Sequence, residues 1–371
     1  MILDSIKIKN FKAVRDSGSV RLGPLTALVG NNGSGKSSLI EALETYQAIV
    51  SDGLDVAMQR FMGIEHVQNK RAKPDTPISF ELRMRGPFGK THLSMAVASD
   101  ASRSAYAITD ETVVCKEHLM ISQGLTEQER KQFKTRWNSG FSMLGGTVYM
   151  LEYANLVESW QFLTLAPERM GYPLPQKRTG GRVRLARDGS NIAEFLLALR
   201  DLDAQALEGI IQTMAYVLPY ARDLQPAITS ELERKAWLQL TEGDFKVPGW
   251  MLSTGTLRVL ALLALLRHPT PPPLLVIEEI ENGLDPRSIH LLVEEMRTAV
   301  LSGTTQIILT THSPYLLDLL KLEQLVLVAR DEMGEPRFYR PGNDEKLKEW
   351  AKEFAPGRLY TMGSLHEAAQ K

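Results

Sequence analysis

The sequence has little cysteine, no long apolar run and no secretion signal. Its 371 residues contain one cysteine, Cys115, so an intramolecular disulfide and a zinc site built from cysteines are both excluded. The longest apolar run, from Val259 to Leu266, is too short to cross a bilayer. Charged side chains stand in the first residues, where a signal peptide needs a continuous apolar stretch. We therefore expect a cytoplasmic protein without a membrane partner.

The chain also lacks an excess of charge of either sign. It has 43 basic and 44 acidic residues and a formal net charge of -1, so a nucleic-acid surface would have to be a local patch. One such patch lies within residues 176–187, which hold five cations and no acid. It can be interpreted equally as a contact to nucleic-acid phosphates or as a solvated hairpin. The five cations are Lys177, Arg178, Arg182, Arg184 and Arg187.

No sustained heptad pattern occurs between residues 54 and 250, which excludes a long coiled coil, and no internal repeat is present. The apolar periodicity instead alternates between short strands and helices, which predicts an α/β protein of one large domain or two ordinary ones. We expect strands at 2–22, 25–29, 274–277, 306–310 and a terminal pair at 325–329 and 337–340, hairpins at 78–97 and 236–247, a further strand at 106–115, and helices at 126–137, 192–218, 286–303 and 346–354.

Residues 25–50 carry the clearest chemical signal. An apolar strand, Leu25 to Val29, leads into Gly30-Asn-Asn-Gly-Ser-Gly-Lys-Ser and then into an apolar-periodic helix. Glycines at 30, 33 and 35 allow backbone N–H groups to turn inward around a phosphate, and the start of the helix adds its positive dipole end. In this pattern Lys36 reaches the β- and γ-phosphates and the Ser37 hydroxyl binds Mg²⁺. The segment predicts a nucleotide-binding site.

Four later segments follow in a fixed order. They are Leu252–Thr256, the strand that ends in Glu278 and Glu279, the turn 282–285, and Thr310–Pro314. Together with the phosphate loop they resemble the ATP-binding-cassette type of P-loop ATPase, in the branch that contains RecF, SMC and OLD-like proteins. The likeness covers residues 1–50 and 250–320. It implies a mixed sheet with flanking helices, a head formed by residues 1–53 and 250–371, and an inserted α+β region at 54–249 between the phosphate loop and the signature.

The resemblance also implies roles for residues. Ser253 and Gly255 would touch nucleotide held by the opposite subunit, and a helix starting there would direct its positive end at the γ-phosphate. Glu278 would order Mg²⁺ through water, and Glu279 would polarise the attacking water. The remaining implied contacts are His312 at the γ-phosphate, Asp285 at the dimer seam, and Lys12, Asn31, Asn32, Gly33, Ser34, Gly35 and Ser38 at the nucleotide.

Two residues depart from the commoner family pattern. Thr254 replaces a glycine of transporter signatures, and Glu278 stands where aspartate is usual. The longer acid shifts the metal geometry by about one methylene, so turnover would be slow. A glutamine that contacts the metal is also expected, and both Gln59 and Gln68 are candidates.

Three functions compete for an ATPase with these motifs. A transporter motor is disfavoured because Ser253 lies 217 residues after Lys36, where transporter cassettes have about a hundred, and a RecF-like DNA-repair ATPase would want a more basic surface. OLD proteins carry a nuclease domain after the ATPase, and only 59 residues follow His312. The chain resembles instead the AAA-family ATPase subunits of two-gene antiphage systems such as Septu or PARIS. This implies an ATP-dependent dimer or higher oligomer that controls a nuclease or toxin encoded alongside.

Overall fold

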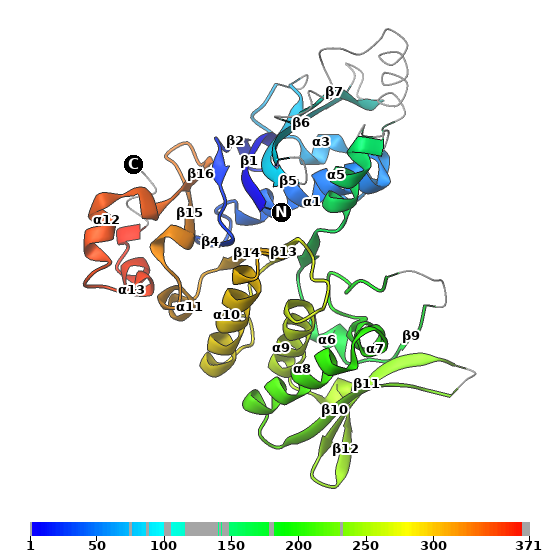
Figure 1. Ribbon diagram of the computed structural model, residues 1–371. Coiled ribbons are helices and arrows are strands. Elements are labelled where there is room, and N and C mark those ends of the chain that lie inside the picture. The colour runs from blue at the N-terminus through cyan, green and yellow to red at the C-terminus, as the bar shows by residue number, and fades with distance from the viewer. Residues whose placement is uncertain are drawn as a thin grey trace. The chain divides into compact units, whose positions relative to one another are not determined.

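The computed structural model describes residues 2–73, 76–86, 89–99, 105–115, 140, 142, 148–177, 182–230 and 233–365. The chain forms two compact units: residues 1–160 with 306–371 make unit 1, and residues 161–305 make unit 2. Figure 1 labels the elements of both units. The division predicted from the sequence, a head at 1–53 and 250–371 with an insertion at 54–249, was defined by the positions of motifs, whereas these two units are defined by contacts in space. The predicted division stays a prediction.

Unit 1 contains an antiparallel sheet in the order β2-β1-β5-β6-β7, with β3 also paired to β1. Alternate positions of β1 and β6 are buried, as expected for strands with one face on a core. The hairpin predicted at 78–97 is confirmed by the pairing of β5 with β6, and the strand predicted at 106–115 is confirmed by the pairing of β6 with β7. The strands are β1 Ile2–Phe11, β2 Val14–Asp16, β3 Val20–Arg21, β5 Ile78–Gly86, β6 Gly89–Ser99 and β7 Tyr106–Cys115.

A second set of strands in unit 1 runs in the order β16-β15-β4-β14. β4 (Leu25–Val29) pairs in parallel with β14 (Gln306–Thr311) and with β15 (Leu325–Arg330), and β16 (Pro336–Tyr339) closes the edge antiparallel to β15. Every residue of β4 and β14 is buried. Burial of every residue is typical of parallel strands covered on both faces.

Helix α1 (Lys36–Asp52) follows the phosphate loop and is held by aromatic packing. The Tyr46 ring lies 6.0 Å from the Phe80 ring and 6.5 Å from the Trp160 ring. Gln47 adds amide hydrogen bonds to the carbonyls of Val157 and Trp160, at 2.9 and 2.8 Å. The other helices of unit 1 within the described residues are α2 Leu54–Gln59, α3 Ile64–Val67, α5 Val148–Glu158, α11 Pro314–Asp318, η3 Leu322–Gln324, η4 Pro341–Asn343, α12 Glu345–Trp350 and α13 Pro356–Thr361.

Unit 2 contains a short parallel pair, an antiparallel sheet and a group of helices. β8 (Gln161–Leu163) pairs with β13 (Leu274–Ile277), and β10, β11 and β12 form the sheet, with β9 at its side. The apolar helix α9 (Thr254–Leu266) packs against α6, α8 and α10, as Figure 1 shows. The remaining bounds are α6 Pro167–Met170, β9 Leu174–Pro175, α7 Ile192–Leu202, α8 Ala204–Val217, β10 Ala221–Ile228, β11 Lys235–Glu242, β12 Phe245–Pro248, η2 Gly249–Met251 and α10 Pro286–Leu301.

The helix predictions need two corrections. The helix expected over 192–218 breaks at Asp203, whose extended backbone lets its carboxylate accept the Ala206 N–H at 3.0 Å and cap α8. Aspartate prefers this capping role to a helix interior. The helix expected over 346–354 ends at Trp350, and a separate helix, α13, starts at Pro356. The helix predicted at 126–137 lies outside the described residues.

Candidate functional site: a phosphate loop and an acidic strand end

The phosphate loop joins the buried strand β4 to α1, as predicted. Gly33 has φ +75° and Gly35, which precedes the helix, has φ +116°, both in the region that favours glycine. A Cβ on Gly33 would meet nothing within 4 Å, so the space beside it is open. The loop therefore has the backbone freedom and the room that an anion cradle needs.

Lys36 folds back over this loop. Its Nζ donates to the carbonyls of Gly30 at 2.5 Å and Asn31 at 3.0 Å, and the residue is only 9% exposed. Ser34 Oγ is buried without a hydrogen-bond partner, although buried hydroxyls are normally paired. Ser37, in the first turn of α1, is exposed. A cation, an unsatisfied hydroxyl and an exposed hydroxyl thus surround a helix start, which suits a phosphate group.

His312 follows the neighbouring strand at the same sheet edge. Thr311 stands opposite Val29, so the carboxyl ends of β4 and β14 meet beside the phosphate loop. His312 itself is exposed, and the next residue, Ser313, caps α11 by accepting the Leu316 N–H at 3.3 Å. His312 thus follows a strand that ends beside the phosphate loop, and its role at a phosphate stays a prediction.

The β15–β16 hairpin holds the phosphate loop from the other side. Arg330 Nε donates to the Gly33 carbonyl at 2.8 Å, and its Nη1 donates to the Gly334 carbonyl at 2.6 Å. A Cβ on Gly30 would lie 2.1 Å from the Val328 carbonyl oxygen, so this strand approaches the loop as closely as glycine permits. Sequence reasoning missed Arg330 because 297 residues separate it from Gly33.

Two more residues of unit 1 lie near α1 and the loop. The Tyr360 hydroxyl of α13 donates to Asn31 Oδ1 at 3.3 Å, a contact that no sequence motif indicates. Lys12 forms an ion pair with Glu41 of α1 at 2.6 Å and lies over the Phe61 ring at 4.6 Å. The predicted contact between Lys12 and nucleotide stays a prediction. The other loop residues named from the sequence, Asn32 and Ser38, are exposed and buried respectively.

Unit 2 places Glu278 in a hydrogen-bonded cluster at the end of β13. Its Oε1 accepts from the Thr164 hydroxyl at 2.9 Å and from Arg187 Nη2 at 3.0 Å. The acids were expected after this strand and are found there. The partners Thr164 and Arg187 were not expected, because both belong to other segments of the chain.

Glu279 has an unusual backbone. Its φ is +49°, which costs a non-glycine residue about 1–3 kcal/mol and tends to occur at functional sites. Its side chain accepts the Asn282 amide at 2.5 Å, and the residue is exposed. The pKa of Arg258 in α9 is lowered by burial, and the negative charges of Glu168 and Glu279 offset part of this effect. Glu279 is therefore an exposed carboxylate, bonded to Asn282 and influencing a cation on α9.

The signature segment begins α9. Ser253 caps the helix by accepting the Thr256 N–H at 3.1 Å, so the helix starts at Thr254 and includes Gly255 in its first turn. A Cβ on Gly255 would lie 2.7 Å from the Gly283 carbonyl oxygen. The signature and the 282–285 turn therefore pack closely because position 255 is glycine.

Asp285 caps α10. Its carboxylate accepts the N–H groups of Arg287 at 2.9 Å and Ser288 at 3.2 Å. The Ser288 hydroxyl, which also donates to it, is the largest influence that holds the Asp285 pKa below its ordinary value. Capping is thus the observed role of Asp285, and a place at a dimer seam stays a prediction.

Several residues of the basic segment, 176–187, form hydrogen bonds and an ion pair within the protein. Arg187 pairs with Glu278, and Arg182 donates to the Thr270 carbonyl. The Arg184 carbonyl accepts from Asn191 at 2.9 Å, and the Lys177 N–H donates to Glu194 at 2.6 Å. Arg178 lies outside the described residues. Contact with nucleic acid stays a prediction.

Both candidates for the metal-contacting glutamine, Gln59 and Gln68, lie in unit 1. Gln68 donates to the Thr76 carbonyl at 2.8 Å, and Gln59 is exposed at the end of α2. Across the described ranges, no three His, Cys, Asp or Glu side chains gather as a metal cage. Mg²⁺ does not require one, because one or two carboxylates and substrate phosphates commonly hold it. Exposed Ser37 and the carboxylate of Glu278 are oxygen donors of the class that a nucleotide-borne Mg²⁺ uses.

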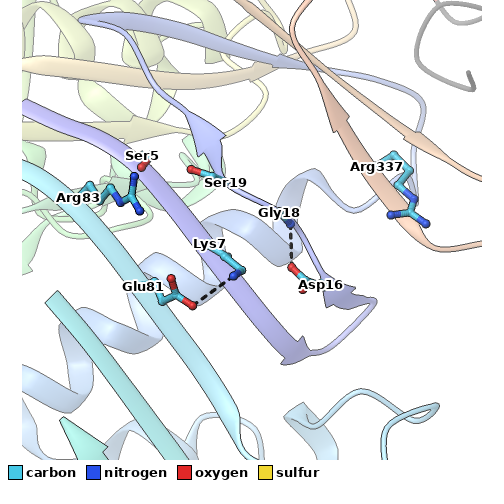
Figure 2. Close-up of a pocket in the computed structure, with 8 residues that line it drawn as sticks. All are labelled: Ser5, Lys7, Asp16, Gly18, Ser19, Glu81, Arg83 and Arg337. Atoms are coloured by element: carbon cyan, nitrogen blue, oxygen red, sulfur yellow. Dashed lines mark hydrogen bonds and ion pairs between the residues drawn. The ribbon is translucent and has the colours of Figure 1, made fainter. Parts of the chain in front are cut away.

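Unit 1 also has a pocket away from the phosphate loop. It has a volume of about 430 Å³ and mixes charges of both signs, among them Lys7, Glu81 and Arg337 (Figure 2). Lys7 pairs with Glu81 at 3.4 Å, and Arg337 pairs with Asp331 at 2.8 Å. Of the three cations that line the pocket, Lys7 and Arg337 therefore have acidic partners, and the third, Arg83, is exposed.

Comparisons with known proteins agree with this geometry. The family described as "AAA ATPase domain" matches residues 1–49, and the one described as "AAA domain, putative AbiEii toxin, Type IV TA system" matches residues 166–318. Among the helices that the structure describes, none is long and apolar enough to cross a membrane.

The similar curated proteins are ATP-binding proteins. Nod factor export ATP-binding protein I of Sinorhizobium fredii (strain NBRC 101917 / NGR234) is 33% identical over 143 residues, which is 38% of each chain. The same-named protein of Rhizobium leguminosarum bv. viciae is 33% identical over 137 residues, 36% of this chain and 40% of that one. The alignment thus spans well under half of each of these two relatives.

Solved structures show the same fold over most of the chain. The SMC head bound to the C-winged helix domain of ScpA has a TM-score of 0.59 at 13% identity, and the match covers 91% of this chain and 98% of that one. The Smc head with an extended coiled coil bound to the C-terminal domain of ScpA, derived from Pyrococcus furiosus, has a TM-score of 0.55 at 12% identity, covering 94% and 99%. The predicted fold class is confirmed: the chain has the fold of a P-loop ATPase of the SMC-head type.

Proposed function

We propose that this protein binds ATP with Mg²⁺ and hydrolyses it. The observation that carries the proposal is the phosphate loop, where Lys36 is held on the loop carbonyls beside the unsatisfied hydroxyl of Ser34. An incoming phosphate offers Lys36 a charge-assisted partner and offers Ser34 an acceptor. Both groups are already in place, so binding costs little rearrangement.

The remaining residues divide the chemistry between binding and hydrolysis. Ser37 and Glu278 would hold Mg²⁺, which supplies charge neutralisation at the phosphates. Glu279 takes the proton of the attacking water, and its exposed carboxylate with Asn282 as a hydrogen-bond partner supports that role. His312, exposed beside the phosphate loop, stabilises the γ-phosphate.

ATP binding would control a partner. In this proposal two chains, or a higher oligomer, associate around ATP in the cytoplasm and regulate an effector such as a nuclease or toxin encoded alongside, in antiphage defence. Support comes from the matched family, whose description names a toxin of a type IV TA system, and from similar SMC heads that were solved bound to ScpA domains. Copurification with the product of the neighbouring gene, with and without ATP, tests this part.

Glu279→Gln tests the ATPase assignment. The variant should bind a fluorescent ATP analogue like the parent, while hydrolysis falls about 10²–10⁴-fold because the amide cannot accept a proton. Lys36→Ala should lose binding itself. Glu294→Gln, which makes the same change at a half-exposed acid of α10, is the matched control and should behave as the parent. Parent-like hydrolysis by Glu279→Gln would show that another group is the general base.

A further inference from the structure

Arg187 and Glu278 form a built ion pair in unit 2. The guanidinium Nη2 lies 3.0 Å from Glu278 Oε1, and Thr164 Oγ1 lies 2.9 Å from that same oxygen. Arg187 Nε also donates to Thr164 Oγ1 at 3.2 Å. The three side chains therefore bond one another in a closed triangle, with a single carboxylate oxygen accepting twice.

The backbone keeps this triangle in place. The Glu278 N–H donates to the Leu163 carbonyl, which extends the pairing of β13 with β8, and the Thr164 N–H donates to the Arg187 carbonyl, both at 2.9 Å. The Ala166 N–H donates to the Asp188 carbonyl, also at 2.9 Å. Arg187 is thus part of a segment that is laced to the end of β8, and its contact with Glu278 follows from that placement.

The ion pair has a consequence for a metal ion. Glu278 is the shielded member, with its side chain 15% exposed against 38% for Arg187. A free divalent cation that approaches Glu278 meets the positive guanidinium on the same oxygen and is repelled. A metal ion that arrives on ATP belongs to a complex of net negative charge, which the guanidinium attracts instead.

We propose that Arg187 is the counter-ion of Glu278 and keeps free divalent cations from binding at the end of β13. The inference rests on the proposed function, because it takes Glu278 as a metal-binding acid. Arg187 acts through Glu278 and is therefore a positioning residue. The site takes its metal ion together with a nucleotide and not alone.

Binding of Mn²⁺ to the full-length chain without nucleotide, followed by electron paramagnetic resonance, tests the proposal. Charges of +1 and +2 about 6 Å apart in water interact by enough to change an affinity about tenfold, and the dielectric of water suits a half-exposed arginine. Arg187→Gln should therefore bind Mn²⁺ about tenfold tighter than the parent. Arg187→Lys, which keeps the charge, should remain close to the parent.

Arg182→Gln is the matched control. It removes a cation from the same segment, but this cation bonds the Thr270 carbonyl, before the start of β13, whereas Glu278 follows the end of the strand. Its Mn²⁺ affinity should equal that of the parent. Thermal unfolding of each variant confirms that the fold is retained, and the lysine variant preserves the test if glutamine destabilises the segment.

Two further measurements separate this inference from the proposed function. Glu278→Gln combined with Arg187→Gln should abolish the tighter Mn²⁺ binding, and Arg187→Gln should not tighten binding of the fluorescent ATP analogue without metal, because it removes a positive charge. If Arg187→Gln binds Mn²⁺ no tighter than the parent, the counter-ion role is wrong, whereas the proposed ATPase fails separately if the parent does not bind the ATP analogue.

Discussion

Three carboxylates in unit 2 differ in their structural roles because they have different hydrogen-bond partners. Asp285 accepts hydrogen bonds from the first turn of α10, Glu278 accepts from Thr164 and Arg187, and Glu279 accepts from Asn282. Of these three acids, only Glu279 combines an exposed position with a positive φ. The residue type alone does not distinguish these three acids, whereas their surroundings do.

Asp285 should make the stability of the fold depend on pH. Its folded pKa is lowered from 3.8, first by the hydrogen bond from Ser288 and against the opposing effect of burial. The ionised cap therefore contributes stability above the unfolded pKa and loses it as the pH falls through the folded pKa. Asp285→Asn keeps the cap acceptor but removes its charge, so it should be about 0.3–1 kcal/mol less stable than the parent at pH 7.

The free energies of unfolding of the parent and Asp285→Asn should converge as acid protonates Asp285. Urea unfolding at steps from pH 7 downward measures this, and Asp285→Ala, which lacks a cap acceptor at every pH, serves as the control and should lose about 1 kcal/mol at pH 7. A difference between parent and Asp285→Asn that stays constant into acid would mean that the charge contributes nothing.

At the scale of elements, the phosphate loop depends on the strand beside it. β15 supplies the Val328 carbonyl that excludes a side chain at Gly30, and Arg330 at its end bonds the Gly33 carbonyl. The loop is therefore shaped on one side by its own glycines and on the other by a hairpin from the last fifth of the chain. Its local pattern accounts only for the first of these.

Alanine substitutions should separate the two influences. Gly33→Ala meets open space and suffers only the left-handed backbone cost of about 1–2 kcal/mol. Gly30→Ala would place its Cβ 2.1 Å from backbone of β15, so β4 and β15 must separate and the loss of stability should be clearly larger. Denaturant midpoints of both variants give the comparison, and equal losses would contradict a close approach of β15.

At the scale of the whole molecule, the phosphate loop belongs to unit 1 and the signature to unit 2. Lys36 begins α1, and Ser253 caps α9. The resemblance to RecF and SMC proteins implies that these two helix starts meet on one nucleotide only across a dimer. That association is a prediction for this chain.

Mixing two inactive variants tests it. In a mixed dimer of Lys36→Ala and Ser253→Arg chains, one site carries both defects, but the other combines an intact phosphate loop with an intact signature. Nucleotide-dependent association should therefore reappear on mixing, with partial hydrolysis if one site suffices. Differently tagged chains first establish that subunits exchange. Demonstrated mixed dimers that recover neither property would falsify the shared site.

The sequence by itself determined the local chemistry of this protein. The phosphate loop is one contiguous segment that contains the glycines, Lys36 and the start of the next helix. The two acids at the end of β13 come directly after an apolar run in the sequence. Such features depend on neighbours along the chain, so their pattern predicts them, as it predicts the paired strands with clear alternation. A helix broken at Asp203 was missed because a local hydrogen bond there prevailed over apolar periodicity.

The tertiary structure alone decided which distant residues act on those segments. Arg330 reaches Gly33 across 297 positions, Tyr360 reaches Asn31 across 329, and Arg187 reaches Glu278 across 91. An arginine or tyrosine gives no local sign of such a partner in the sequence, because the two residues come together only when distant segments pack. For that reason the sequence left the basic segment open between a nucleic-acid contact and a solvated hairpin, and only the folded chain shows Arg187 bonded to the acid at the end of β13.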